Sequence, residues 1–223
     1  MRKTILVVAA HPDDEALGCG GTIARHVADG DTVHTLFMTD GVGSRGESDN
    51  AAVSERRGAA EKAGEILSIN TATYQGWPDN RMDSVDLLDV VQSAEDVISS
   101  LQPQVIYTHH SGDLNIDHRI THQAVLTACR PQPGFGVRAI YAFEVPSSTE
   151  WATPNRDPFL PNAYVDIGVF LATKVHALKA YDAEMRKPPH SRSVEHIESM
   201  AQHRGYTVGV AAAEAFMIIR IVR

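Results

Sequence analysis

The feature that most constrains the fold is the alternation of strand and helix patterns along the chain. Apolar runs predict strands, and amphipathic stretches between them predict helices. The predicted strands are Thr4–Ala10, Val33–Met38, Thr71–Gln75, Gln104–His109, Val137–Glu144 and Phe216–Val222. The predicted helices are Ala16–Ala28, Ser54–Leu67, Asp86–Leu101, His118–Ala128, Thr173–Ala183 and Ser193–His203. This order is typical of an α/β protein with a Rossmann-like, mainly parallel sheet flanked by helices.

The size and charge of the chain indicate one domain with a small-molecule partner. With 223 residues, 43% of them hydrophobic, the chain can bury one large core, and we expect a single domain over residues 1–223. The segment Pro146–Pro161, rich in Ser, Thr and Pro, predicts a long loop inside it. The formal net charge of -8 disfavours nucleic acid and anionic membrane surfaces, because both favour a basic face.

Cysteine usage and the first residues bear on location. Cys19 and Cys129 are too few for a disulfide framework. The apolar run that follows Met1–Lys3 is too short for a secretory signal or a membrane span. We therefore expect a cytoplasmic protein without a membrane span, and the sequence leaves its oligomeric state open, a homo-oligomer included.

Polar loops follow the first four predicted strands. They are His11–Glu15, Thr39–Arg45, Trp77–Asp83 and His109–His118. In open α/β sheets, ligands bind outside the carboxyl ends of the strands, near the point where the strand order reverses. The four loops therefore predict one polar pocket.

The first of these loops has the composition of a metal site. Ionised carboxylates next to a buried strand are costly unless they are paired or bind a metal. Catalytic zinc and related metals use three His or carboxylate ligands and keep one position open. His11 and Asp14 can supply two ligands. The third can come from His118 or His122, which lie one helical turn apart on the same face.

Other interpretations of the same stretch are weaker. A dinucleotide-binding loop would need the G-x-G-x-x-G spacing, which Gly18, Gly20 and Gly21 do not have. Asp13 and Glu15 could be ordinary acids in a first helical turn, where the helix dipole favours them. That alternative suits Glu15 better than it suits two adjacent aspartates that follow a histidine.

Several motifs together resemble a known family. They are Ala10–Glu15 (AHPDDE), Gly18–Gly21, Pro78–Arg81, Gly112–His118 (GDLNIDH) and Ala213–Phe216. Over most of its length the sequence resembles the PIG-L/LmbE family of zinc-dependent N-deacetylases, which act on N-acetylglucosamine-type sugars and related amides. The resemblance implies an LmbE-like fold, zinc bound by His11, Asp14 and His118, and Asp13 as the general base. It favours His118 over His122 as the third ligand.

The sequence departs from the family pattern at one position. Many members have a histidine three residues before the last zinc ligand, where it stabilises the intermediate or protonates the leaving group. This chain has Asn115, whose amide can donate a hydrogen bond but cannot supply a proton. The acid role is then left to Asp13 or to one of His109, His110 and His122.

The remaining rim residues suggest a polyol or phosphorylated substrate. We expect it to contact Arg45, Arg57, Asn80, Arg81 and Asp83. The alternative for Arg56 and Arg57 is a solvated helix face shared with Glu55 and Glu61, and Trp77 can either stack on a sugar or pack in the core. Further candidates for the pocket lining are His190, Arg192 and Glu214.

The function expected from the sequence is zinc-dependent hydrolysis of the acetamide of an N-acetylated amino sugar or sugar conjugate, which releases acetate and a free amine. One alternative is a metallohydrolase of another amide or of a phosphoester, because the same metal chemistry serves all of them. Another is a metal- or sugar-binding protein that has lost catalysis. Asp13 disfavours that last alternative, and Asn115 modestly favours it.

Overall fold

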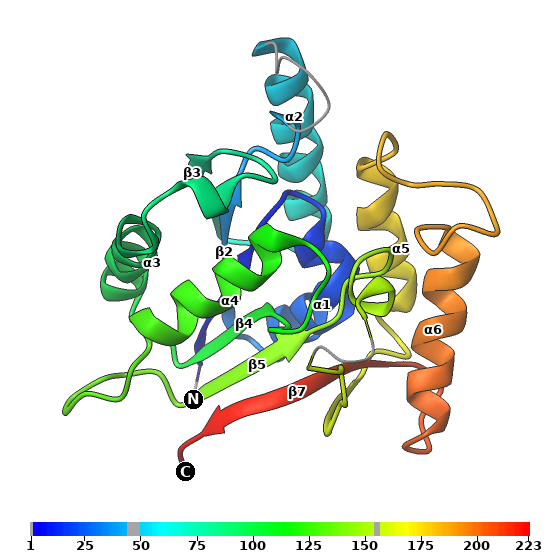
Figure 1. The fold of residues 1–223 in the computed structure, drawn as a ribbon. Helices are drawn as coiled ribbons and strands as arrows, with labels where there is room; N and C mark the ends of the chain where they lie inside the picture. The colour runs from blue at the N-terminus through cyan, green and yellow to red at the C-terminus, as the bar shows by residue number, and fades with distance from the viewer. Residues whose placement is uncertain (1, 44–49, 154–156) are drawn as a thin grey trace.

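The computed structural model describes residues 2–43, 50–153 and 157–223, which are built around a seven-stranded sheet (Figure 1). The strand order is β3-β2-β1-β4-β5-β7-β6. Strands β1 to β5 pair in parallel, whereas β7 pairs antiparallel with both β5 and β6. The strands are β1 Thr4–Ala9, β2 Thr32–Thr39, β3 Thr71–Trp77, β4 Val105–His109, β5 Ala139–Phe143, β6 Ala163–Asp166 and β7 Ala213–Ile221. The prediction of a mainly parallel sheet is confirmed.

Helices cover both faces of the sheet (Figure 1). Helices α1, α2, α5 and α6 lie on one face, and α3 and α4 pack together on the other. The helices are α1 Asp14–Ala28, α2 Asn50–Leu67, α3 Leu87–Leu101, α4 Ile116–Ala128, α5 Leu171–Ala180 and α6 Val194–Tyr206, with short 3-10 helices η2 Met82–Ser84 and η3 Thr149–Trp151. All six predicted helices are present, with ends displaced by a few residues.

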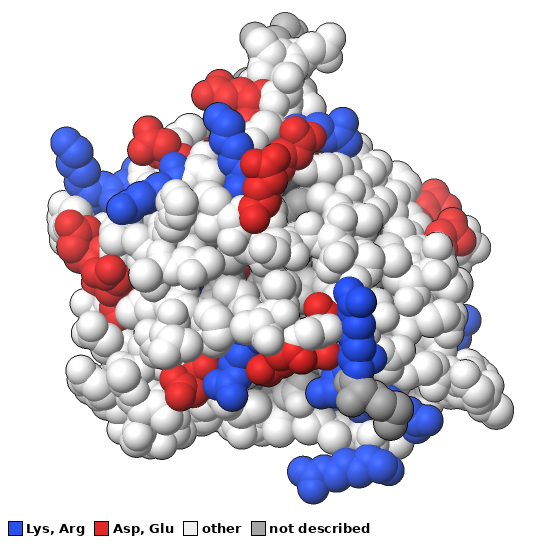
Figure 2. Space-filling model, turned by 180° about the vertical axis from the view of Figure 1, so that it is seen from behind, with Lys and Arg blue, Asp and Glu red and all other residues white. Residues whose placement is uncertain are grey.

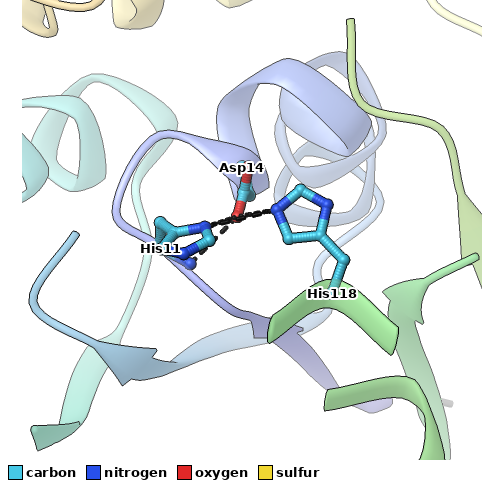
Figure 3. Close-up of side chains that lie close together, drawn as sticks. All are labelled: His11, Asp14 and His118. Atoms are coloured by element: carbon cyan, nitrogen blue, oxygen red, sulfur yellow. Dashed lines mark hydrogen bonds and ion pairs between the residues drawn. The ribbon is translucent and has the colours of Figure 1, made fainter. Parts of the chain in front are cut away.

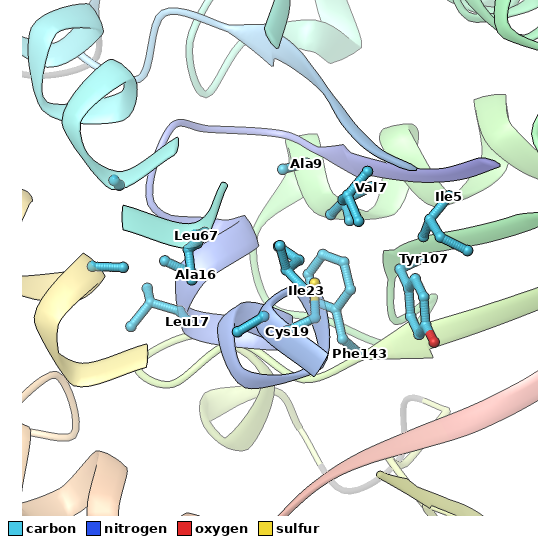
Figure 4. Packing of buried hydrophobic residues seen from close by; sticks show 14 of the residues in the cluster. Ile5, Val7, Ala9, Ala16, Leu17, Cys19, Ile23, Leu67, Tyr107 and Phe143 are labelled. Carbon is cyan, nitrogen blue, oxygen red and sulfur yellow. The ribbon is translucent and has the colours of Figure 1, made fainter. Parts of the chain in front are cut away.

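The core has one apolar cluster on each face of the sheet. Strand β1 contributes to both, because successive side chains of a strand point to opposite faces. Ile5, Val7 and Ala9 join the cluster under α1, as Figure 4 shows, and Leu6 and Val8 join the cluster under α3 and α4. A strand that is buried on both faces explains why this run is continuously apolar.

One strand was not predicted from the sequence. Strand β6 has only four residues, lies at the edge of the sheet and is partly exposed, so it lacks a strong apolar pattern. The predicted loop Pro146–Pro161 is irregular where the structure describes it, apart from η3.

The glycines of the first helix serve close packing. A Cβ atom on Gly18 would lie 2.3 Å from the Phe143 ring, and one on Gly21 would lie 2.8 Å from Ile167. Between these two glycines α1 is interrupted at Cys19, whose φ of -146° is not helical. The glycines let the two halves of α1 approach β5 and the residue after β6. This close packing accounts for the glycines without a phosphate-binding loop.

A buried ion pair fills the interruption in α1. Lys174 donates to the Leu17 carbonyl at 2.7 Å and lies 2.5 Å from the Glu214 carboxylate. Glu214 in turn accepts the backbone N–H groups of Gly21 and Thr22 at 3.0 and 2.7 Å. The expectation that Glu214 lines the substrate pocket is therefore wrong, because its carboxylate satisfies backbone groups of the broken helix.

Charged side chains of both signs are interspersed on the face shown in Figure 2, and large areas of that face carry neither sign. In the described parts of the chain, no helix is both long enough and apolar enough to cross a membrane.

Candidate metal centre

The loops that follow β1 and β4 meet at the point where the strand order reverses. Strand β1 pairs with β2 on one side and with β4 on the other, so β4 does not lie beside β3, the strand that precedes it in the sequence. This is the position at which open α/β sheets bind ligands. It brings His11 and Asp14 close to His118, although about a hundred residues separate them in the sequence.

Three side chains converge there, as Figure 3 shows. His11 Nδ1 lies 3.0 Å from Asp14 Oδ2, His118 Nε2 lies 3.2 Å from His11 Nδ1, and His118 Nε2 lies 3.3 Å from Asp14 Oδ2. All three residues are at least 93% buried. In a tetrahedral zinc site, metal–ligand bonds of about 2.0–2.1 Å place the ligand atoms roughly 3.3 Å apart. The three atoms therefore form a triangle of the size that one face of such a site has.

An unpaired atom also fits a bound cation. Asp14 Oδ1 is buried and has no hydrogen-bond partner among the described residues. A buried carboxylate oxygen without a partner is costly, and a cation that contacts Oδ1 as well as Oδ2 of Asp14 would remove that cost. Two imidazoles and one carboxylate are a ligand set that suits zinc and related divalent metals.

Carboxylates lie behind both histidines. Asp113 Oδ1 is 3.1 Å from His118 Nδ1. On the other side of the cluster, His11 Nε2 is 3.1 Å from Asp79 and 3.3 Å from Asp117. Metal-binding histidines usually donate their second ring N–H to such a group, which fixes the tautomer and the ring orientation. Both rings are thus arranged with one nitrogen toward the centre and the other toward a carboxylate.

These charges shift the pKa values in the direction that favours a cation. Burial alone would lower the pKa of His118, but Asp14 and Asp113 raise it to about 9. Burial likewise opposes the rise at His11, yet hydrogen bonds to Asp117, Asp14 and Asp79 bring its pKa well above the ordinary value. The carboxylates that favour a proton on each ring also favour a metal ion, which would release these protons on binding.

The other predicted ligand, His122, lies elsewhere. Its Nδ1 is 2.7 Å from the His109 backbone carbonyl. Two groups of described side chains could share a metal, the cluster above and a second one of His11, Asp79 and Asp117, and His122 belongs to neither. The structure brings His118 rather than His122 to the centre, as the resemblance implied.

Asp13 lies next to the cluster with different neighbours. Its Oδ2 accepts from Arg192 Nη1 at 2.7 Å and lies 3.6 Å from Arg56 Nη1. Burial raises the pKa of the Asp13 carboxyl, Arg192 opposes that rise, and the charge of Asp14 adds to it. The backbone at Asp13 has φ 125° and ψ -27°, a conformation that L-residues rarely adopt.

Glu15, the third acid of the motif, is 1% exposed and is not one of the side chains that could share a metal. Its carboxyl accepts the Tyr181 hydroxyl at 2.6 Å and the Asp13 backbone N–H at 3.0 Å. Burial raises the pKa of Glu15 to about 7 against these two hydrogen bonds. Glu15 does lie in the first turn of α1, as one interpretation of the sequence held, but its carboxyl is buried and hydrogen-bonded there.

A pocket of about 100 Å³ opens beside these residues. Of the predicted substrate contacts, only Asn80 lines it; Arg81 and Asp83 are exposed outside it, and Arg45 lies outside the described residues. Arg57 lies over the Tyr74 ring at 4.2 Å and lines a neighbouring pocket. The lining is His11, Asp13, Gly41, Arg56, Asp79, Asn80, Asn115, His118, Ser147, Ser148, Glu184 and Arg192.

Two arginines, Arg56 and Arg192, line one side of this pocket, and the sequence pattern does not predict that they lie there together. Arg56 is 8% exposed and lies 3.1 Å from Glu184, so it does not belong to a solvated helix face. Arg192, a candidate from the sequence, lines the pocket, and so do Glu184 and Ser147, which the sequence does not predict. Arg192 Nε donates to Ser147 Oγ at 2.7 Å, which joins the segment before α6 to the loop after β5. No local motif marks these residues, because they come from segments far from the polar loops.

Two other candidate residues, Trp77 and His190, have packing roles. Trp77 donates to Ser93 Oγ at 3.2 Å and packs against the core, so the packing interpretation is confirmed. His190 packs edge-on against Trp151 at 5.7 Å and does not line the pocket.

Asn115 lies at the start of α4 and faces the pocket. Its Oδ1 accepts the Asp117 backbone N–H at 2.8 Å, which caps the helix, and its Nδ2 donates to Asn80 Oδ1 at 2.9 Å. The alternative proton donors are held elsewhere. His109 is fully buried and accepts the Ala10 N–H, and His110 contacts the Asp157 carbonyl at 2.7 Å.

The fold and the cluster together define an LmbE-like α/β protein with a candidate metal centre at the switch point of its sheet. The family described as PIG-L, GlcNAc-PI de-N-acetylase, matches residues 6–129. An uncharacterized deacetylase, YaiS of Escherichia coli K12, is 30% identical over 186 residues, which cover 81% of this chain and 91% of that protein. The chain belongs to the PIG-L family.

Two further relatives span nearly the whole chain. A 1D-myo-inositol 2-acetamido-2-deoxy-alpha-D-glucopyranoside deacetylase of Saccharomonospora viridis is 25% identical and covers 97% of this chain and 95% of that protein. The crystal structure of GalB, a 4-carboxy-2-hydroxymuconate hydratase of Pseudomonas putida KT2440, superposes with a TM-score of 0.79 at 25% identity over 99% of this chain and 98% of that one. Proteins similar to this chain therefore include deacetylases of N-acetylated sugars and a hydratase.

Proposed function

We propose that this protein is a zinc-dependent N-deacetylase that hydrolyses the acetamide of an N-acetylated amino sugar or sugar conjugate. The observation that carries the proposal is the convergence of His11, Asp14 and His118 beside the buried carboxyl of Asp13, at a pocket that His11, His118 and Asp13 line. The deacetylase activity named for two relatives of this chain supports the choice of reaction.

Zinc is the metal that the ligand set favours. His11 Nδ1, Asp14 Oδ2 and His118 Nε2 would hold it with a fourth position left for water or substrate, as in catalytic zinc sites. When bound there, zinc supplies Lewis-acid chemistry toward the amide carbonyl and a water molecule.

Asp13 carries the proton in this proposal. In the hydrolysis, a water oxygen forms a bond to the acetyl carbon and the C–N bond breaks, which gives acetate and the sugar amine. The Asp13 carboxylate accepts the proton that the water loses and returns it to the departing nitrogen. Its raised pKa suits a group that must both accept and donate a proton. The other candidate proton donors, His109, His110 and His122, do not line the pocket. We therefore assign both proton transfers to Asp13.

Asn115 and Asn80 are placed to bind rather than to protonate. Their side chains are hydrogen-bonded to each other at the edge of the pocket, and an amide N–H can donate to a sugar hydroxyl or to a developing oxyanion. We retain Arg45, Arg81 and Asp83 as contacts only for a substrate that extends beyond the pocket, and Arg57 only for one that also reaches the pocket over Tyr74.

The test is incubation of the purified protein, first freed of metal and then loaded with zinc, with separate panels of substrates. The panels are N-acetylated amino sugars and their conjugates, other amides, phosphoesters, and a carboxylated dienoate as a hydratase substrate. We expect equal amounts of acetate and amine from the first panel, only with metal, and at least about a hundredfold less of both from an Asp13→Asn control. Phosphate release alone, or hydration of the dienoate alone, would refute the deacetylase. Zinc and sugar binding without turnover would indicate the binding protein instead.

A further inference from the structure

Glu15 has no part in the mechanism above, yet it is among the most completely buried acids in the described structure. Its side chain is 1% exposed and belongs to neither group of residues that could share a metal. A carboxyl group is expensive to bury. Its two oxygens have separate partners, one on the backbone of Asp13 and one at the end of α5.

The first partner is the strained residue. The Asp13 N–H donates to Glu15 Oε2 at 3.0 Å, and on the other side of the residue the Asp13 carbonyl accepts from Ala16 and Leu17 at 3.1 and 2.9 Å. Hydrogen bonds thus hold the peptide groups on both sides of the Asp13 Cα, whose φ is 125°. A backbone conformation of this kind persists only when its surroundings fix it.

The second partner keeps the Glu15 carboxyl from rotating. The Tyr181 hydroxyl, which is contributed by the residue after α5, donates to Glu15 Oε1 at 2.6 Å. Tyr181 is 1% exposed and packs in the same cluster as Leu17. With one oxygen on Tyr181, the other is aimed at the Asp13 N–H.

A glycine could adopt this φ without strain, but it would carry no carboxyl group. The sequence has an aspartate there, and that aspartate's side chain reaches the pocket and Arg192. The strained backbone turns the Asp13 side chain toward the arginines while Asp14, the next residue, faces the histidines.

We propose that Glu15, anchored by Tyr181, is a positioning residue that holds the Asp13 backbone in its strained conformation and so aims the proposed base at the pocket. The catalytic part of this inference rests on the proposed function. The structural part, that Glu15 and Tyr181 order the Asp13 backbone, does not.

The test compares Tyr181→Phe with a matched control, Tyr107→Phe. Tyr107 is also buried, at 4% exposure, and its hydroxyl lies 2.9 Å from His26 Nε2, away from the pocket. The first readout is hydrogen exchange of the Asp13 amide, followed by NMR in metal-free protein. Loss of a hydrogen bond of ordinary strength speeds exchange about tenfold, and we expect this in Tyr181→Phe and not in Tyr107→Phe. Glu15→Ala, if it folds, should give a larger increase.

The second readout is kinetics of the zinc-loaded protein. A base displaced by a fraction of an ångström lowers kcat by roughly ten- to a hundredfold with little change in KM. We expect this loss in Tyr181→Phe, with zinc still bound in a chelator competition, and normal kcat in Tyr107→Phe.

Equal exchange of the Asp13 amide in wild type and Tyr181→Phe would overturn the inference. Faster exchange with unchanged kcat would limit the pair to a structural role and refute its catalytic part. If the wild-type protein itself has no deacetylase activity, the proposed function fails, and the exchange readout still decides whether Glu15 and Tyr181 order the backbone of Asp13.

Discussion

Replacing Asp13 by glycine should give a more stable protein than replacing it by alanine. Both changes remove the carboxyl and leave Arg192 and Arg56 without that partner, so this effect cancels in the comparison. The two variants differ in how they tolerate a φ of 125°. Glycine adopts positive φ freely, whereas alanine keeps the Cβ that makes the conformation costly.

The expected difference follows from two opposing terms. A non-glycine residue in a sparsely populated backbone region costs about 1–3 kcal/mol. The greater freedom of glycine in the unfolded chain costs about 0.4–1 kcal/mol in the other direction. Glycine should therefore be favoured by about 1–2 kcal/mol at position 13, the reverse of the usual order at an unstrained site. For a chain of 223 residues, this corresponds to a difference in Tm of about 2–8 °C.

The assay is thermal unfolding of both variants as metal-free proteins, followed by circular dichroism, with urea unfolding as a second measurement. A glycine-for-alanine pair at Ala128, in the last turn of α4, gives the ordinary order, in which alanine is more stable. An alanine variant at position 13 that is as stable as the glycine variant would refute the strain argument. Both should lack turnover, since neither has a base.

Three further predictions concern the metal, the two aspartates and pH. His118→Ala should lose zinc on dialysis and His122→Ala should keep it, as measured by elemental analysis; the opposite result would contradict the ligand assignment. Asp13→Asn should keep zinc but lose turnover by roughly two to four orders of magnitude, whereas Asp14→Asn should lose zinc affinity and recover part of its activity in added zinc. If Asp13→Asn is the variant that loses the metal, the roles are reversed. Burial lowers the pKa of His26 in the folded protein, so its contribution to stability is present above about pH 6.5 and is lost as the pH falls toward the folded pKa. Urea unfolding between pH 7.5 and 5 should show a smaller loss in His26→Gln, and an equal loss would exclude His26 as a cause.

The elements that sequence could predict are those with a strong local pattern. Strand β1 is apolar throughout because both of its faces are buried, and the motif after it identifies the carboxyl end of the sheet. The edge strand β6 has no such pattern. In doubly wound α/β sheets the strand order reverses next to the first strand, and ligands bind at that point. The sequence could therefore also predict that His11 and His118, from the loops after β1 and β4, lie close together.

The surroundings of the centre could not be predicted, because they come from distant segments. Arg192 precedes α6 and Glu184 follows α5, and neither lies in a polar loop after a parallel strand. Only the folded chain brings them to Asp13 and Arg56. Arg57 has the same chemistry as Arg56 and is one position further along α2, but it faces Tyr74 instead. On a helix, neighbouring side chains point about 100° apart. The sequence alone does not say which of the two directions faces the pocket.

The two adjacent aspartates show how one backbone turn separates chemically identical side chains. Asp14 has two histidines at 3.0 and 3.3 Å and a pKa held well below the ordinary value, although burial opposes this, so it remains an anion suited to bind a cation. Asp13 has arginines as neighbours, but burial dominates and raises the pKa of its carboxyl, so it can exchange a proton more readily. Pairs of acids whose surroundings shift their pKa values in opposite directions divide the roles of charge stabilisation and proton transfer. The φ of 125° at Asp13 sets the direction of its side chain relative to that of Asp14, and in this backbone one carboxylate meets the histidines while the other meets the arginines.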